Sequence, residues 1–175
     1  MSQSVQTLIA FDSNVLTAFL NANSKLGESV GDDLASFRLF LYAPELVILP
    51  TVTIEAERIP KDEKREEHLK WVWYHFREAQ LDEVAERIHD RARELLAHHS
   101  ERDIDDCRLL AEAEMAHVDV LSTIDKRIKR LQRHTAVQLL TPARTVEHLG
   151  IVPGAYPSRE PGNRHPHAGA TWWRI

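Results

Sequence analysis

Five carboxylates lie beside apolar segments of the sequence, and they are the side chains best suited to chemistry: Asp12, Glu55, Glu57, Asp106 and Asp125. Carboxylates that meet at one place repel one another unless a cation joins them. Hard oxygen ligands favour Mg²⁺ or Mn²⁺ over zinc. Such a metal lowers the pKa of bound water and stabilises charge on a phosphate. The residue types therefore indicate a magnesium or manganese site that acts on phosphoesters.

Two of these acids come just after short apolar runs that are typical of buried strands. Asp12 follows the run at residues 5–11, and Asp125 follows the run at 118–123. The two glutamates come soon after a third run, at 46–49. Ligands of open parallel sheets bind beyond the carboxyl ends of the strands, where the strand order reverses. We therefore expect the acids to face one cleft at that edge.

Apolar periodicity predicts the elements that would position these side chains. Buried strands are predicted at residues 5–11, 46–49, 118–123 and 136–140. Helices are predicted at residues 13–21, 32–41, 51–58, 100–115, 125–133 and 142–149, and as two long patterns within 61–99. Strands that alternate with helices imply a parallel sheet with helices on both faces. The fold class is therefore α/β.

Each acid taken alone also fits a structural role. Asp12 and Asp125 are placed to cap the helices that follow them. Glu55 and Glu57 lie in the first turns of a helix, where the helix dipole favours acidic side chains. The joint pattern outweighs these separate explanations, because it gathers several acids at one edge of the sheet.

Composition excludes several classes of protein. The chain has 175 residues, which indicates one domain, and 22 basic against 27 acidic residues give a net charge of −5. This mild acidity argues against a simple nucleic-acid coat protein. The single cysteine, Cys107, excludes an intrachain disulfide and a cysteine-rich zinc site. A single cysteine suits a reducing setting, so we expect a cytoplasmic protein. Apolar runs are shorter than the ~20 residues of a membrane span, so we expect no membrane partner.

A change of composition divides the chain near residue 152. Residues 1–152 are predicted to form the domain, with a long helical hairpin at 61–99. Residues 153–175 form a tail that holds four of the eight prolines and three of the six glycines. The tail ends in two tryptophans, an arginine and an isoleucine, and we expect this apolar end to dock on another surface.

Three segments together resemble the successive motifs of PIN domains, the nuclease domains of VapC-type toxins and related ribonucleases: residues 9–16, 106–113 and 119–125. The resemblance covers residues 5–150 in the right order. It implies a three-layer α/β/α sandwich with a parallel sheet of four to five strands. It also implies an endoribonuclease that uses Mg²⁺ or Mn²⁺ to hydrolyse RNA phosphodiester bonds, as the toxin of a toxin–antitoxin pair.

The resemblance gives roles to individual residues. Asp12, Asp106 and Asp125 match acids of the family and are the expected metal ligands. Asn14 matches a small polar companion position, and Thr123 is the hydroxyl neighbour of the last acid. Catalysis would use these three aspartates and one glutamate.

The glutamate of the site stays ambiguous in the sequence. The family has a glutamate shortly after the second strand, and both Glu55 and Glu57 fit that place. The two project about 200° apart on an ideal helix, so both are not expected to face one metal equally. Counting from Thr51 favours Glu57, and Glu55 remains open.

A basic segment follows the last acid and is the candidate RNA-binding surface: Lys126, Arg127, Lys129 and Arg130. These side chains would bind RNA phosphates. A solvated helix face that packs through Ile128 and Leu131 is the structural alternative. We expect a small antitoxin protein and a second copy of the chain, as a homodimer, to be partners. The sequence does not name the RNA.

Two other functions remain open. A haloacid-dehalogenase-like phosphatase would use Asp12 as its nucleophile, although that family usually has a second acid where this chain has Asn14. A non-catalytic PIN-like module would act through residues 61–99 and the tail. Binding of Mg²⁺ or Mn²⁺ separates the nuclease from this last alternative.

Overall fold

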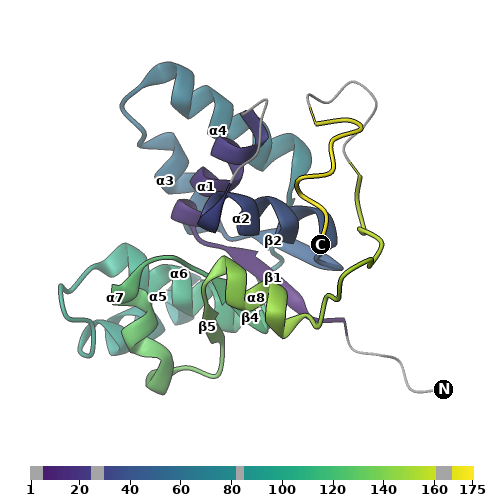
Figure 1. The fold of residues 1–175 in the computed structure, drawn as a ribbon. Coiled ribbons are helices and arrows are strands. Elements are labelled where there is room, and N and C mark those ends of the chain that lie inside the picture. Colours follow the sequence, from purple (N-terminus) through teal and green to yellow (C-terminus); the bar gives the residue numbers. More distant parts are fainter. Residues whose placement is uncertain (1–5, 25–29, 82–84, 161–166) are drawn as a thin grey trace.

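A parallel sheet of five strands forms the centre of the fold (Figure 1). The computed structural model describes residues 6–24, 30–81, 85–160 and 167–175. The strands lie in the order β3-β2-β1-β4-β5. Their bounds are β1 (Leu8–Phe11), β2 (Glu45–Ile48), β3 (Arg77–Glu78), β4 (Val120–Ser122) and β5 (Gln138–Leu140). The predicted α/β class with a parallel sheet is confirmed.

Helices join the strands and complete the three layers (Figure 1). They are α1 (Ser13–Ser24), α2 (Gly31–Tyr42), α3 (Pro50–Glu57), α4 (Asp62–His75), α5 (Ala85–Leu96), α6 (Ile104–Met115), α7 (Lys126–Lys129) and α8 (Pro142–His148), with a 3₁₀ helix at Arg130–His134. The second long helical pattern was expected to begin near residue 82, and residues 82–84 lie outside the described part of the chain.

The strand order reverses direction between β1 and β4. From β1 the chain builds β2 and β3 on one side, then returns past β1 to add β4 and β5 on the other. Right-handed connections that run in opposite directions place their helices on opposite faces of the sheet. Accordingly α1 packs on α2 over one face, and α5 packs on α6 over the other (Figure 1). The reversal leaves a crevice beyond the carboxyl ends of β1 and β4.

An aromatic cluster around Phe19 anchors the layer of α1, α2 and α4. The Phe19 ring lies 4.8 Å from Phe40, 5.0 Å from Trp71 and 5.7 Å from Phe76, between ring centroids. Phe19 itself is fully buried. These contacts hold α1, and with it the residues that directly follow β1, in a fixed position against the sheet.

The described residues 61–81 and 85–99 do not pack as the expected helical hairpin. The first helix ends at His75, and Phe76 adopts an extended backbone that places its ring 5.9 Å from Phe11 in the core. The chain then pairs with β2 as the two-residue strand β3. Consequently α4 packs on α3, whereas α5 packs on α6 on the opposite face. A strand of two exposed residues has no periodicity that a sequence pattern could reveal.

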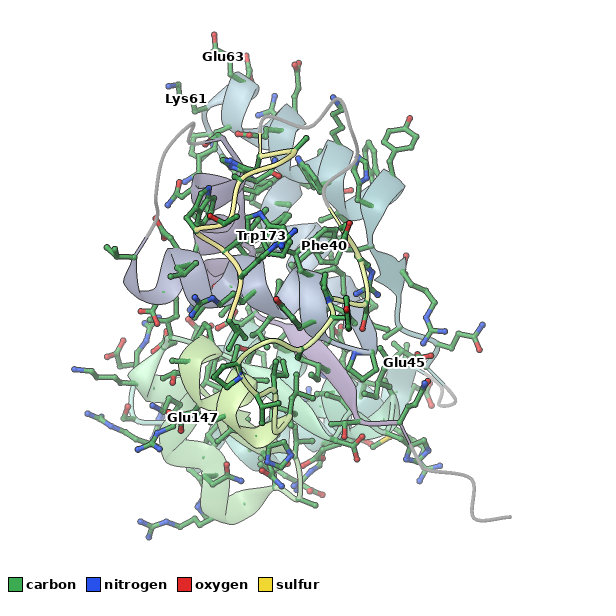
Figure 2. All side chains as sticks on the ribbon, turned by 45° about the vertical axis from the view of Figure 1, so that its right-hand side comes forward. Phe40, Glu45, Lys61, Glu63, Glu147 and Trp173 are labelled. Atoms are coloured by element: carbon green, nitrogen blue, oxygen red, sulfur yellow. The ribbon has the colours of Figure 1, made fainter. Side chains whose placement is uncertain are left out.

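The C-terminal tail docks on α2, as its apolar end suggested. Trp173 is 2% exposed and lies beside the helix that carries Phe40 (Figure 2). Arg38 donates hydrogen bonds from Nε to the Trp173 carbonyl, at 3.0 Å, and from Nη2 to the Arg174 carbonyl, at 2.8 Å. No helix in the described part of the chain has the length and apolar character that crossing a membrane requires.

Candidate active site

Asp12 and Asp125 meet at the crevice because β1 and β4 are adjacent and in register. Phe11 pairs with Ser122, the last residue of β4. The Asp12 backbone N–H continues this ladder by donating to the Ser122 carbonyl at 3.0 Å. The residues that follow the two strands therefore leave the sheet side by side, as predicted from the sequence.

The Asp12 carboxylate is buried and held by two hydroxyl groups. Thr123 Oγ1 donates to Asp12 Oδ2 at 2.6 Å, and Ser13 Oγ donates to Oδ1 at 3.3 Å. Burial raises the pKa of Asp12, both hydroxyl groups counter this, and the negative charge of Asp125 adds to it. The α1 N–H groups bond to the Asp12 backbone carbonyl. Hydroxyl groups from the start of α1 and from the segment after β4 thus orient the carboxylate from two sides.

Glu55 joins Asp12, whereas Glu57 does not. Glu55 is half-buried, and its Oε2 atom is buried without a hydrogen-bond partner among the described residues. Burial raises its pKa to about 7; the Ser13 hydroxyl opposes the rise, and the negative charge of Asp12 adds to it. Glu57 is exposed to solvent. The side of α3 that faces the crevice is therefore the side that carries Glu55, contrary to the preference for Glu57 drawn from the sequence.

Asp106 lies in the first turn of α6, where its carboxylate interacts electrostatically with that of Asp125. Its Oδ2 atom lies 3.0 Å from Nε2 of His99. Burial and the charges of Asp103 and Asp125 raise the pKa of Asp106 to about 6, against the opposing effect of His99. Asp103 is the N-cap of α6 and accepts from the Asp105 N–H at 3.0 Å. The helix predicted to begin near residue 100 thus begins with Asp103 as its cap.

Asp125 combines a structural role with its place in the crevice. Its Oδ1 atom caps α7 by accepting from the Arg127 N–H at 2.7 Å. The Arg127 guanidinium also donates from Nε to Asp125 Oδ2 at 2.9 Å, and from Nη1 to Glu101 at 3.0 Å. These bonds hold the pKa of Asp125 below its usual range. Asp125 is therefore ionised, with Arg127 as its counter-charge.

The four acids differ in how their charge is balanced. Asp125 has Arg127, but burial and neighbouring carboxylates raise the pKa values of Asp12, Glu55 and Asp106. In their present positions, no three His, Cys, Asp or Glu side chains among the described residues are placed to hold a metal ion. The buried, unpartnered Oε2 of Glu55 nevertheless lies in this electronegative crevice. A divalent cation would supply positive charge to balance these carboxylates, so the residue types at the site fit such a cation.

Comparison with known proteins identifies the family. The sequence matches the PIN domain family over residues 9–134. The chain belongs to this family. The crystal structure of FitAcB from Neisseria gonorrhoeae has a similar fold, with a TM-score of 0.51, 15% sequence identity, and coverage of 77% of this chain and 98% of that one. No curated protein matches the sequence.

This membership confirms the resemblance that the three sequence motifs indicated. PIN domains are generally nucleases, and the chain therefore belongs to a family of nucleases that includes toxins of toxin–antitoxin pairs. At 15% identity, the likeness to FitAcB shows the fold alone.

Two companion residues of this PIN domain, Asn14 and Thr123, connect the segments that carry the acids through hydrogen bonds. Asn14 Oδ1 accepts from the Ile124 N–H at 3.2 Å, which ties the start of α1 to the segment after β4. The Thr123 hydroxyl donates to Asp12 and accepts from the Asp125 N–H at 3.0 Å. Thr123 therefore links the first acid to the last.

The predicted RNA-binding residues differ in their accessibility. Lys126 and Arg130 are exposed, and Lys129 is half-buried. Arg127 is occupied by Asp125 and Glu101. The positive surface beside the site is thus formed by the two lysines and Arg130, whereas Arg127 belongs to the acid cluster.

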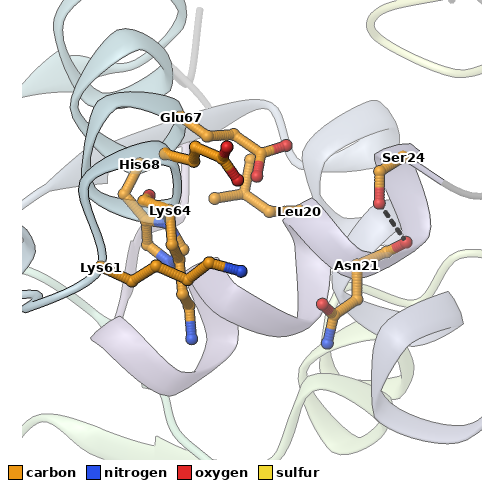
Figure 3. A pocket seen from close by; sticks show the side chains of 8 residues that line it. Leu20, Asn21, Ser24, Lys61, Lys64, Glu67 and His68 are labelled. Atoms are coloured by element: carbon orange, nitrogen blue, oxygen red, sulfur yellow. Dashed lines mark hydrogen bonds between the residues drawn. The ribbon is translucent and has the colours of Figure 1, made fainter.

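Two hollows share His68, one between α1 and α3 and the other between α1 and α4. The smaller, of about 270 Å³, is lined by Ser13, Asn14, Glu55 and His68 among others, so it opens beside the acids. The larger, of about 350 Å³, shares His68 and carries both Lys64 and Glu67 (Figure 3). Its mixed charge gives no preference for an anion, so we assign it no ligand.

His99 is the polar residue of the site that the sequence gives no sign of. It lies between two helices, seven residues before Asp106, in no recognisable metal or catalytic spacing. Its burial and its contact with Asp106 come from the packing of α5 on α6.

Proposed function

We propose that this PIN domain is a metal-dependent endoribonuclease that hydrolyses RNA phosphodiester bonds and is the toxin of a toxin–antitoxin pair. The observation that carries the proposal is the approach of Asp12, Glu55, Asp106 and Asp125 at the strand-order reversal, where burial raises the pKa values of Asp12, Glu55 and Asp106. Ligand sites of open α/β sheets lie at such reversals.

The proposed metal is Mg²⁺ or Mn²⁺, held by Asp12, Asp106 and Asp125 with Glu55 beside them. When bound, it would supply positive charge that polarises the phosphate and activates water. The oxygen-only donor set suits these hard cations and not zinc. The buried Oε2 of Glu55, which has no hydrogen-bond partner among the described residues, would gain a partner from a cation.

The chain's own residues have distinct tasks in this proposal. Thr123 and Ser13 fix the two oxygens of Asp12, so that its carboxylate cannot turn away from the crevice. Glu55, with a pKa of about 7, can accept or release a proton near neutral pH, which suits a general base for the attacking water. The proposal therefore uses Glu55 and leaves Glu57 outside the site.

RNA is the proposed substrate, bound along the surface of α7. Lys126, Lys129 and Arg130 offer positive charge next to Asp125, where phosphates on either side of the cleaved bond would lie. Phosphate contacts of this kind carry no base specificity. We therefore expect these side chains to contribute to the affinity for RNA but not to a preference for its sequence.

The partners proposed are a small antitoxin and a second copy of the chain. Exposed aromatic side chains on α4, Trp73 at 59% and Tyr74 at 77%, support an apolar contact there. Light scattering of the wild type and of a Trp73→Ser/Tyr74→Ser variant tests the homodimer. A monomeric wild type, or a variant dimer as stable as the wild-type dimer, contradicts it.

The decisive experiment measures cleavage of single-stranded RNA with Mg²⁺ or Mn²⁺, and with a chelator. We expect 5′-phosphate and 3′-hydroxyl ends, and loss of cleavage in Asp12→Asn and in Asp125→Asn. Glu57→Gln is the matched control and should cleave like the wild type, because Glu57 is exposed. Equal cleavage by the wild type and Asp12→Asn would falsify the proposed site.

The toxin role has its own test in cells. Induced expression of the wild type should arrest growth, and Asp12→Asn at the same expression level should not. If both proteins arrest growth, the toxicity does not depend on the acidic residues of the site. The phosphatase alternative gains no support, because Asn14, where a phosphatase would carry its second acid, accepts a hydrogen bond from the Ile124 N–H.

A further inference from the structure

His99 lies buried directly behind Asp106. Its side chain is 0% exposed, and its Nε2 atom is 3.0 Å from Asp106 Oδ2. His99 follows the C-terminus of α5, and Asp106 lies in the first turn of α6. The contact therefore joins the loop between these helices to one of the acids that line the crevice.

The backbone around His99 determines which ring nitrogen carries the proton. Nδ1 lies 3.2 Å from the Glu101 N–H and 3.3 Å from the Asp103 N–H. Backbone N–H groups only donate, so Nδ1 must accept and cannot carry a proton. The nitrogen that can donate is then Nε2, which lies 3.0 Å from a carboxylate oxygen of Asp106. The loop thus selects the tautomer that donates to Asp106.

We infer that His99 is a positioning residue that holds the Asp106 carboxylate in the orientation needed to bind the divalent cation, an inference that rests on the proposed nuclease function. Oδ2 is engaged by His99, and within the described chain Oδ1 accepts no hydrogen bond that would turn it elsewhere. The remaining oxygen is therefore the one available to a cation. A fixed carboxylate loses less rotational freedom on binding than a mobile one.

The two aspartates differ in how many of their oxygens are engaged. Asp106 meets the His99 imidazole through Oδ2 alone, at 3.0 Å. Both oxygens of Asp125 accept from the Arg127 guanidinium, Oδ1 at 3.1 Å and Oδ2 at 2.9 Å. Asp106 therefore offers a cation an oxygen that is not shared with a guanidinium.

The same loop fixes both partners of the contact. Asp103 offers its backbone N–H to Nδ1 of His99, and its side chain caps the helix on which Asp106 lies. A shift of the loop would therefore move the imidazole and the carboxylate together. This arrangement explains why a buried histidine is placed at a loop and not in a helix.

Two substitutions of His99 test the hydrogen bonds of its two ring nitrogens separately. In His99→Asn, the amide oxygen replaces Nδ1 and can accept from the loop, but the side chain is too short to reach Asp106. In His99→Gln, the amide nitrogen replaces Nε2 and can donate to Asp106, but the acceptor for the loop is lost. Mn²⁺ affinity by titration calorimetry and thermal unfolding of the metal-free chain are measured for both variants and the wild type.

We expect Mn²⁺ binding to weaken about tenfold or more in His99→Asn, and much less in His99→Gln, because a lost supporting hydrogen bond costs about 10–100-fold in metal affinity. Thermal stability should follow the opposite order, since the asparagine keeps the loop bonds. A merely structural histidine would make affinity follow stability.

The outcomes distinguish this inference from the proposed function. Wild-type binding that persists unchanged in His99→Asn, or that falls equally in both variants, overturns the inference alone. A wild type that binds neither Mn²⁺ nor Mg²⁺ overturns the proposed function and this inference with it. ¹⁵N spectra of the metal-free chain give an independent check, in which a proton on Nδ1 would refute the hydrogen-bond assignment.

Discussion

Glu55→Gln should make the metal-free protein more stable above pH 7. Burial raises the pKa of Glu55 from its ordinary value of 4.5 to about 7. Because the pKa is higher in the folded state, ionised Glu55 destabilises the fold. This penalty is absent below pH 4.5, grows as the pH rises from 4.5 to about 7, and is constant above that. Glutamine stays neutral and has no such penalty.

The structure sets the size of this effect. The shift of 7 − 4.5 = 2.5 corresponds to about 3.4 kcal/mol at 1.36 kcal/mol for each pKa unit. Glu55 is half-buried, so solvent screening reduces this to about 1–2 kcal/mol. The assay is urea unfolding of the wild type and variant between pH 4 and pH 9 with a chelator present.

Glu57→Gln is the control for this experiment, because Glu57 is exposed on the same helix. Its free energy of unfolding should stay within about 0.5 kcal/mol of the wild type at every pH. A stability difference in Glu55→Gln that does not depend on pH would refute the reasoning. So would a pH-dependent gain in Glu57→Gln, which would move the site glutamate to that position.

Three further changes test other parts of the structure. Thr123→Val removes the hydroxyl that donates to Asp12, so Mn²⁺ affinity in calorimetry should fall by about tenfold, whereas Thr123→Ser should retain it; equal affinities would contradict the contact. Asp103→Ala removes the cap of α6 and should lower the free energy of unfolding by about 1 kcal/mol, with Asp103→Asn as the control that keeps the cap. Trp173→Ala empties a buried position of the tail and should cost about 3–5 kcal/mol in urea unfolding, and a loss below 1 kcal/mol would show that the tail is not docked.

Most of the fold could be predicted from the sequence because its strands are short apolar runs separated by helical patterns. Strand β3 could not, since Arg77 and Glu78 are exposed and become a strand by pairing with β2. The same pairing separates α4 from α5, and the expected hairpin failed for this reason. Local periodicity indicates which residues are buried, so it cannot predict an edge strand that consists of two exposed residues.

Some features of the candidate site follow from the local sequence, whereas others depend on how distant elements pack. Asp12 and Asp125 could be placed from the sequence, because parallel strands bring their carboxyl ends to one edge of a sheet. The choice between Glu55 and Glu57 could not be made, because it depends on the rotation of α3 about its axis. That rotation is set by what α3 packs against, including α4 and α6.

The sequence by itself determined the class of fold, the family and the acids at the strand ends, since these follow from residue types and short spacings. The tertiary structure decided which glutamate faces Asp12, that Arg127 balances Asp125, and that His99 lies against Asp106. Each of these depends on the orientation of a side chain toward a residue on another element. Such orientations arise when helices pack on the sheet, and hydrogen bonds then fix them.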